Sequence, residues 1–326
     1  MEYRRLGKTG FRVSAVGFGA WAIGADWGDV AERDAIAALH TAADAGVTFF
    51  DTADVYGDGR SERLIGRFIK ERGEDLVVAT KIGRRAPLDL SEYSYERFRD
   101  WVDRSRKNLG MDILHLVQLH SLLTDVYYRP EIFQWLDELV AEDRIAHYGV
   151  SVERVEEALK AIQFPGVATV QIIFNIFRQR PADLFFNQAS LKDAGIIARV
   201  PLASGLLTGK FGPSTTFPPN DHRNFNRHGD AFDIGETFAG VDFDTGIKVV
   251  EEIHSLVPKD MTLAQFALKW ILMHPEVSTV IPGAKNPRQA RDNAAAADKE
   301  DLDQATMECL SSFYRDEIAP QVHHRW

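Results

Sequence analysis

The chain is organised around the stretch FFDTADVYG, residues 49–57. The apolar run from Val47 to Phe50 has the length and the β-branched and aromatic content of a buried strand. Asp51 then lies at the carboxyl end of that strand, and Tyr56 lies on the loop beyond it. Because α/β barrels and open α/β sheets carry their chemistry at the carboxyl ends of strands, both side chains are candidates for a functional site. The plainer alternative is that Asp51 caps a turn and Tyr56 only packs.

The same alternation of apolar runs and helical patterns recurs along the whole chain. Strands are predicted at 15–19, 47–50, 76–80, 113–119, 145–150, 168–173, 196–200 and 277–281. Helices are predicted at 31–45, 61–69, 95–109, 130–142, 153–162, 184–194, 263–273, 287–297 and 301–313. Eight apolar strands separated by helices favour a closed (β/α)8 TIM barrel over an open sheet. No linker or repeat divides residues 1–326, so we expect a single α/β domain, with a hairpin at residues 3–13 before the barrel.

Two segments depart from this alternation. Residues 211–246, after predicted strand seven, are rich in Pro, Asn, Asp and Gly and have little periodicity, which is typical of a functional or a disordered loop. The aromatic and basic side chains in this loop are Phe217, His222, Arg223, Phe225, Phe232 and Phe238. The tail, residues 319–326, ends in Trp326, which we expect to be exposed and to dock as a substrate lid or on a second subunit of a homo-oligomer. A disordered tail is the alternative.

Composition limits the classes of function. The 326 residues carry a net charge of −10, so neither nucleic acid nor an anionic membrane is favoured as a partner. A single cysteine, Cys309, excludes an intrachain disulfide framework and a cysteine-rich metal site. Residues 1–10 lack the apolar core of a signal peptide, and no apolar run approaches the ~20 residues that span a bilayer. The expectation is a cytoplasmic globular protein that acts on a small molecule.

Four polar side chains follow three consecutive predicted strands. Asp51 and Tyr56 follow the second strand, Lys81 ends the third and His120 ends the fourth. In a barrel all four would face one mouth. A free tyrosine has a pKa of about 10, and an adjacent ammonium group lowers it, so Lys81 would make Tyr56 a better acid. Asp51 could hold Lys81, and His120 could donate a hydrogen bond to a substrate oxygen.

Each of these residues also has a plainer interpretation. Lys81 could be an exposed lysine at a strand end, and His120 a core histidine, a role that His115 on the same strand could fill instead. Metal binding is not expected, because His115 and His120 are five residues apart on a strand and point to opposite faces. Ser204 lacks the strand–elbow–helix context of a hydrolase nucleophile. The joint placement of the four residues at neighbouring strand ends favours a catalytic site.

Several motifs, in this order, resemble the aldo-keto reductase superfamily. They are Asp51-Thr52-Ala53-Asp54-Val55-Tyr56-Gly57, Thr80-Lys81, Gln118-Leu119-His120, Gly149-Val150-Ser151, Pro201 through Lys210 and Ile281-Pro282-Gly283. The resemblance covers essentially the whole chain. It implies a (β/α)8 barrel that reduces aldehydes or ketones with NADPH, with a catalytic tetrad of Asp51, Tyr56, Lys81 and His120 in which Tyr56 is the proton donor.

The resemblance also implies a cofactor track. It places Gly19, Ala20, Trp21 and Asp51 at the nicotinamide; Ser151 and Gln171 at the carboxamide; Pro201, Leu202, Ser204, Leu206 and Lys210 along the pyrophosphate; and Gly283, Lys285, Gln289 and Asn293 at the adenosine. Two positions depart from the family pattern. Val152 replaces the usual Asn, and Arg199 stands where many members have an aromatic that stacks on the nicotinamide. Lys285, with Arg288 or Arg291, offers positive charge to a 2′-phosphate, so NADP is expected rather than NAD.

Three alternatives remain open at this stage. Residues 17–22, GFGAWA, fit the dinucleotide fingerprint of an open Rossmann sheet, but the predicted helix begins only near Val30. Some members of the superfamily serve as cofactor-binding regulatory subunits of channel proteins, with little turnover. A structural barrel without cofactor is the third option.

Overall fold

The computed structural model describes residues 1–24 and 27–326, and within them eight parallel strands form one sheet. The strands are β3 (Phe18–Gly19), β4 (Phe49–Asp51), β5 (Val77–Ile82), β6 (Leu114–His120), β7 (Ile145–Ser151), β8 (Val167–Ile173), β9 (Gly195–Arg199) and β10 (Val277–Val280). Each strand pairs with the next one along the chain. Parallel bridges join Val16 to Val280 and Gly19 to Gly283, so the first and last strands also meet. The sheet is closed, and the predicted (β/α)8 barrel is confirmed.

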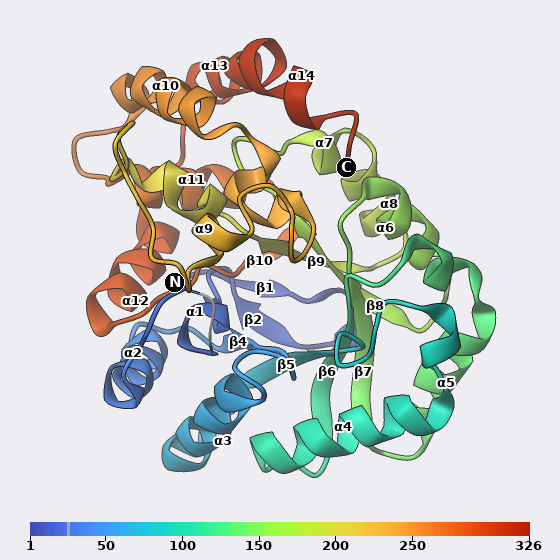
Figure 1. Cartoon of the computed structure of the whole chain (residues 1–326). Coiled ribbons are helices and arrows are strands. Elements are labelled where there is room, and N and C mark those ends of the chain that lie inside the picture. Colours follow the sequence, from blue (N-terminus) through green and yellow to red (C-terminus); the bar gives the residue numbers. More distant parts are fainter. Residues whose placement is uncertain (25–26) are drawn as a thin grey trace.

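Helices follow the strands along the chain and surround the sheet (Figure 1). They are α2 (Glu32–Asp44), α3 (Arg60–Arg72), α4 (Tyr95–Leu109), α5 (Pro130–Ala141), α6 (Val155–Ala161), α7 (Arg180–Asp183), α8 (Phe185–Leu191), α11 (Leu263–Leu272) and α12 (Pro287–Ala294). The ends of α4 show how local sequence sets these bounds. The Ser94 hydroxyl accepts a hydrogen bond from the backbone N–H of Arg97, and Gly110 ends the helix in the left-handed conformation. Both ends of α4 fall where the sequence predicts them.

The hairpin closes the end of the barrel at which the strands begin. Strand β1 (Tyr3–Arg5) pairs antiparallel with β2 (Arg12–Ser14), and a short 3₁₀ turn (Gly7–Thr9) lies between them. The Phe11 ring packs edge-on against His115 and His147, with centroid distances of 5.8 and 5.3 Å. In an apolar cluster of the barrel interior, the side chains of Leu6, Phe49, Leu116 and Ile197 are fully buried. This end is filled with side chains, so the chemistry is confined to the opposite mouth.

The expectation for the segment after the first strand needs a correction. The one-turn helix α1 (Trp21–Gly24) opens directly after β3, whereas the sequence predicted no helix before about Val30. The fingerprint in residues 17–22 therefore does have a helix behind it. The open Rossmann sheet is nevertheless excluded, because the backbone N–H groups of Gly17 and Gly19 donate to the carbonyl groups of Val280 and Pro282 and close the barrel.

The long loop after β9 is folded against the rest of the chain. Residues 211–242, which we call the strap, contain the short helix α9 (His222–Phe225), and α10 (Phe243–Ile253) begins where the strap ends. An antiparallel bridge pairs Asp221 with Trp27, which lies on the loop after the first strand. The strap, which belongs to the loop after β9, is therefore joined to the loop after β3 at the barrel mouth.

The prediction of an exposed Trp326 is wrong. After α13 (Gln304–Phe313) and α14 (Ala319–Val322), the tail folds back onto the strap, and only 4% of Trp326 is exposed. Its indole packs where added Cβ atoms at Gly235 and Gly240 would lie 3.0 and 2.5 Å from the ring. The sequence could not show this seat, because it is formed by residues about 90 positions away.

The close pairing of β7 and β8 generates a stability prediction. An added Cβ at Gly149 would lie 2.1 Å from Thr169 Oγ1 and 2.5 Å from the Thr169 carbonyl oxygen, which belongs to the backbone of β8 and cannot move aside without disturbing the sheet. We expect Gly149→Ala to lower the free energy of unfolding by about 1–3 kcal/mol, the usual cost of overpacking. Urea unfolding measures it. Gly212→Ala, at a position with open space, is the control and should change the value by less than about 0.5 kcal/mol. Equal effects at the two sites would contradict the prediction.

Candidate active site

The strands bring the four predicted catalytic residues to one mouth of the barrel. Asp51 is the last residue of β4, Lys81 lies near the end of β5, and His120 is the last residue of β6. Tyr56 lies on the turn between β4 and α3. Gly57, directly after it, has φ +58°, and an added Cβ there would lie 2.4 Å from the Gly24 carbonyl oxygen. A side chain at position 57 would therefore displace the turn that carries Tyr56.

Lys81 is held by three oxygen atoms in an enclosed position. Its side chain is 1% exposed, and its Nζ lies 2.6 Å from Asp51 Oδ2, 2.9 Å from the Thr52 carbonyl oxygen and 3.4 Å from Tyr56 Oη. Burial lowers the pKa of Lys81, but the Asp51 carboxylate and Tyr56 outweigh burial, so the net shift of that pKa is upward. Lys81 therefore remains a cation beside the phenol, and the interpretation as an exposed lysine is wrong.

Two amide side chains fix the other oxygen of Asp51. Gln171 Nε2 donates to Asp51 Oδ1 at 2.8 Å, and Gln118 Nε2 donates to the same atom at 3.3 Å. Gln171, predicted from the resemblance to contact a carboxamide, thus also orients the carboxylate that holds Lys81. The mouth is built as one network in which each buried polar group restrains the next.

The pKa of Tyr56 differs from the expectation. Desolvation of the phenol raises this pKa above its ordinary value, and Asp51 and Glu236 raise it further, whereas Lys81 lowers it only in part. The expected net lowering is therefore wrong for the site as it stands. The physical reason is that burial acts on the charged phenolate more strongly than one ammonium group can offset. Tyr56 is consequently a neutral phenol with a proton to donate.

His120 faces Tyr56 across the mouth as a neutral ring. The two rings are edge to face with centroids 5.7 Å apart. Burial, together with the positive charges of Arg84, Lys81 and Arg199, holds the pKa of His120 well below its ordinary value. A neutral imidazole has one N–H donor and one acceptor, so it can polarise a carbonyl oxygen without competing for the proton.

A cavity of about 680 Å³ joins the four residues to most of the predicted cofactor track. The predicted cofactor residues that line it are Gly19, Trp21, Asp51, Ser151, Gln171, Arg199, Pro201, Leu202, Ser204, Lys210, Gly283, Lys285, Gln289 and Asn293. Ala20 and Leu206 are fully buried and do not line it. Ala20 and Leu206 can therefore contribute to cofactor binding through their backbone or their packing, but not through a side-chain contact.

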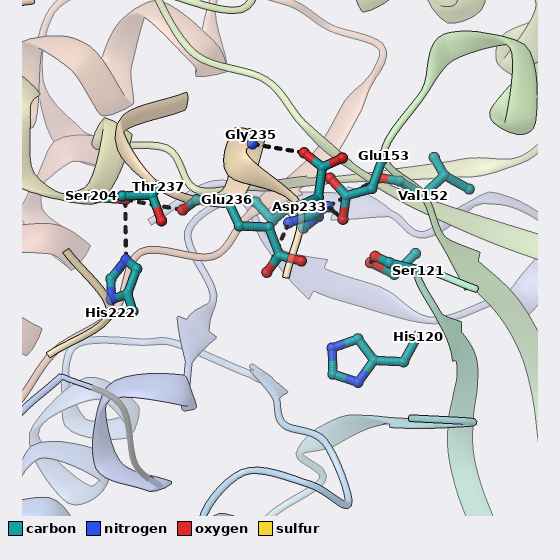
Figure 2. Close-up of polar contacts among 12 residues, drawn as sticks. His120, Ser121, Val152, Glu153, Ser204, His222, Asp233, Gly235, Glu236 and Thr237 are labelled. Carbon is teal, nitrogen blue, oxygen red and sulfur yellow. Dashed lines mark hydrogen bonds and ion pairs between the residues drawn. The ribbon is translucent and has the colours of Figure 1, made fainter. Parts of the chain in front are cut away.

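Arg199 and Ser204, both in the predicted cofactor track, are held by other residues of the mouth and the strap. Arg199 donates to Glu153 Oε1 at 2.6 Å and lies 3.7 Å from Glu236 Oε2. The Ser204 hydroxyl donates to the Glu236 carbonyl oxygen at 3.1 Å and accepts from the Phe238 backbone N–H at 3.0 Å. Figure 2 shows Ser204 and Glu153 on either side of Glu236, with His120 facing the same space. Arg199 is thus oriented by two carboxylates, and Ser204 holds the strap.

Three charged residues of the mouth were not predicted from the sequence. Arg84 donates from Nε to the His120 carbonyl oxygen at 2.9 Å and pairs with Glu236 Oε1 at 3.0 Å. Glu153 pairs with Arg199 as described. Arg84 and Glu153 each stand two residues beyond a strand end, at Ile82 and Ser151, and that spacing was a usable signal. No sequence signal pointed to Glu236, because it lies in the aperiodic strap.

The far end of the cavity is basic. The Asn286 side chain caps the N-terminus of α12, and the Gln289 side chain accepts from the Lys285 backbone N–H at 2.8 Å. Lys285 and Arg288 line the cavity, and Arg291 does not. Burial and the neighbouring Arg223 lower the pKa of Lys285, whose ammonium contacts the Trp27 carbonyl oxygen. Two cations and a helix N-terminus make this end suitable for a phosphate group.

Aromatic side chains of the strap pack over the mouth. The His222 ring lies 4.8 Å from Trp21 and 4.3 Å from Trp27, and Phe232 packs edge-on to Trp21 at 5.8 Å. Trp21 in turn stacks on Tyr56 at 6.1 Å. The strap therefore forms a wall of the space beside the phenol.

Residues 1–24 and 27–326, which the structure describes, contain neither a membrane-spanning helix nor a cluster of metal-binding side chains. None of the helices in this part of the chain has the combined length and hydropathy that spanning a bilayer requires. Across the same residues, His, Cys, Asp and Glu side chains form no group of three or more that could hold a metal ion.

The buried Lys81–Asp51 pair generates a stability prediction. Lys81→Met leaves Asp51 enclosed without its cation, and we expect a loss of about 3–5 kcal/mol in the free energy of unfolding. Lys248→Met, which breaks an exposed pair with Glu317, is the control and should cost about 0–1 kcal/mol. Denaturant unfolding of both variants checks this. Comparable small losses would show that Asp51 and Lys81 are solvated.

Comparison with known proteins places the chain in a family. The Aldo/keto reductase family profile matches residues 15–315. The chain is 27% identical to an uncharacterized oxidoreductase, YqkF, of Bacillus subtilis, over 98% of each chain. It is 30% identical to a probable voltage-gated potassium channel subunit beta of Arabidopsis thaliana, over 91% of this chain and 92% of that one.

The fold matches solved structures as well. A structure of an aldo/keto reductase from Klebsiella pneumoniae in complex with NADP and acetate superimposes with a TM-score of 0.70 and 22% identity over 96% of each chain. The barrel, the hairpin and the profile match lead to one conclusion. The chain belongs to the aldo/keto reductase family and is an oxidoreductase of that family.

Proposed function

We propose that this protein reduces the carbonyl group of an aldehyde or ketone with NADPH, and that Tyr56 is the general acid. The observation that carries the proposal is the placement of the neutral Tyr56 phenol 3.4 Å from the Lys81 ammonium group, with the His120 ring 5.7 Å away across the mouth. A phenol beside a cation and a neutral imidazole can donate a proton to an oxygen while a second group polarises that oxygen.

The residues present fit a dinucleotide cofactor. The cavity runs from the tetrad to the basic end at Lys285 and Arg288, so it offers an enclosed reaction end and a phosphate-binding end. Ser151 and Gln171 would hold the carboxamide, and residues 201–210 would follow the pyrophosphate. When bound, NADPH would supply a hydride to the carbonyl carbon.

The protein's own residues divide the remaining tasks. His120 would orient and polarise the substrate oxygen, since its pKa is held low enough to keep the ring neutral. Tyr56 would donate its proton to that oxygen as negative charge develops. Lys81, kept charged by Asp51, would stabilise the phenolate left behind. Gln118 and Gln171 would keep Asp51 in place.

A regulatory role with little turnover is the second candidate. It is favoured by the similarity to a protein named as a probable potassium channel subunit beta. The complete tetrad supports catalysis instead. Oxidation of NADPH in the presence of simple aldehydes, followed by absorbance, separates the two functions: turnover supports reduction, and NADPH binding without turnover supports regulation.

Replacement of the general acid tests the proposed reaction. Tyr56→Phe removes the proton but keeps the ring, so we expect turnover to fall about 100-fold or more, the usual contribution of general acid catalysis. Binding of NADPH, followed by fluorescence, should be retained. Tyr128→Phe is the control, because that side chain is 63% exposed, and it should match the wild type. Full turnover in Tyr56→Phe would remove Tyr56 from the proposed role.

The choice between NADPH and NADH tests the basic end. Lys285→Met removes a cation that lines the cavity, so the dissociation constant for NADPH should rise by about tenfold or more, whereas that for NADH should change little. Arg291→Met removes a nearby cation outside the cavity and is the control. Equal weakening of both cofactors by Lys285→Met would show that Lys285 does not read the 2′-phosphate.

A further inference from the structure

We propose that Glu236 of the strap is a positioning residue of the catalytic mouth and that Trp326, in the tail, sets the position of Glu236. Neither residue belongs to the tetrad or to the predicted cofactor track. The inference rests on the proposed function only for its kinetic readout. It follows from a continuous set of contacts that leads from the tail to the arginines beside His120.

The indole ring of Trp326 lies in a site formed by Arg178, Gly235 and Gly240. The Arg178 guanidinium lies over the ring, 4.1 Å from its centroid, and Arg178 also donates to the Ala239 carbonyl oxygen at 3.3 Å. Arg180 contacts the main-chain oxygen of Trp326. The ring faces Gly235 and Gly240, where an added Cβ would collide with it. A buried guanidinium stacked on indole and two glycines under the ring specify a tryptophan at this position.

The indole also fixes the turn that carries Glu236. Asp233 Oδ1 accepts two hydrogen bonds, one from Trp326 Nε1 at 2.9 Å and one from the Gly235 backbone N–H at 2.7 Å. The second of these caps the 3₁₀ turn Ile234–Glu236, as Figure 2 shows. Loss of the indole would therefore release the residue that caps the turn.

Glu236 connects this turn to the catalytic mouth. Its carboxylate pairs with Arg84 at 3.0 Å and lies 3.7 Å from Arg199, and it lines the same cavity as Tyr56 and His120. Arg84 holds the carbonyl oxygen of His120, and Arg199 is shared with Glu153. Burial raises the pKa of Glu236, but Arg84 and Arg199 outweigh burial and lower it, so the group stays charged.

Two carboxylates therefore hold the cations of the mouth from two different sides. Asp51 restrains Lys81 from the end of β4, and Glu236 restrains Arg84 and Arg199 from the strap. Without Glu236, two guanidinium groups and Lys81 would stand near Tyr56 and His120, with Glu153 and Asp51 as the remaining carboxylates. Glu236 thus sets both the shape and the charge of the wall that a carbonyl substrate meets.

The test is a double-mutant cycle on kcat/KM for a carbonyl substrate. Trp326→Ala and Glu236→Gln should each lower kcat/KM by about tenfold. If Trp326 acts through Glu236, adding Trp326→Ala to Glu236→Gln should cost less than about twofold more. His324→Ala, in the exposed part of the same tail, is the control and should leave kcat/KM, the melting temperature and the strap unchanged. Additive losses in the double variant would overturn the inference.

A second measurement does not depend on turnover. Hydrogen–deuterium exchange should become faster in residues 233–240 of Trp326→Ala than in the wild type, while β4, β5 and β6 stay protected. Unchanged exchange in residues 233–240 would also overturn the inference. A wild-type protein that reduces none of a panel of aldehydes would refute the proposed function, and exchange would still decide whether Trp326 holds the turn of Glu236.

Discussion

The buried ion pair between Lys81 and Asp51 is the interaction on which the mouth of this barrel depends. An ammonium group this enclosed is tolerated only when its donors are satisfied, and here a carboxylate, a backbone carbonyl and the Tyr56 hydroxyl satisfy them. The pair bridges β4 and β5. It therefore requires the strand register that aligns Asp51 with Ala79 and places Lys81 two residues further on.

The Lys81–Asp51 pair also explains why polar side chains are buried around it. Gln118 and Gln171 donate hydrogen bonds to the Asp51 oxygen that does not contact Lys81. Lys81 keeps a positive charge next to the Tyr56 phenol, which burial holds in its neutral form. Around this centre the charges alternate in sign: Arg84 and Arg199 interleave with Glu153 and Glu236. Burial raises the pKa of Glu153, and Glu236 raises it further, although Arg199 opposes both effects. Such a mouth has little net charge but strong local fields, which suits proton transfer to a neutral carbonyl.

Sequence predicted the parts of the structure that local patterns govern. The eight strands and most of the helices between them follow from apolar periodicity, and the ends of α4 follow from Ser94 and Gly110. The helix α10 was not predicted, and its first residues fall inside the loop expected at 211–246. The four residues of the mouth could be found because parallel strands bring their carboxyl ends together. The resemblance to a family then pointed to residues that line the cavity, including Ser151 and Lys285.

Three of the errors concern features that depend on contacts distant in sequence. Trp326 was expected to be exposed, since its seat is built from Arg178, Asp233 and two glycines that no local pattern joins to the tail. The net pKa shift of Tyr56 was expected to be downward, because the adjacent cation can be read from the sequence and the degree of burial cannot. Glu236 was missed for the same reason: only the folded strap brings it to the arginines.

The most direct test of the central claim is the fate of a labelled hydride. The wild-type protein would be mixed with an aldehyde and NADPH that carries deuterium at the transferable C4 position, and the product analysed by mass spectrometry and NMR. Our account predicts an alcohol with one deuterium on the former carbonyl carbon. An alcohol without deuterium on that carbon, or binding of NADPH with no alcohol formed from any aldehyde, would contradict it.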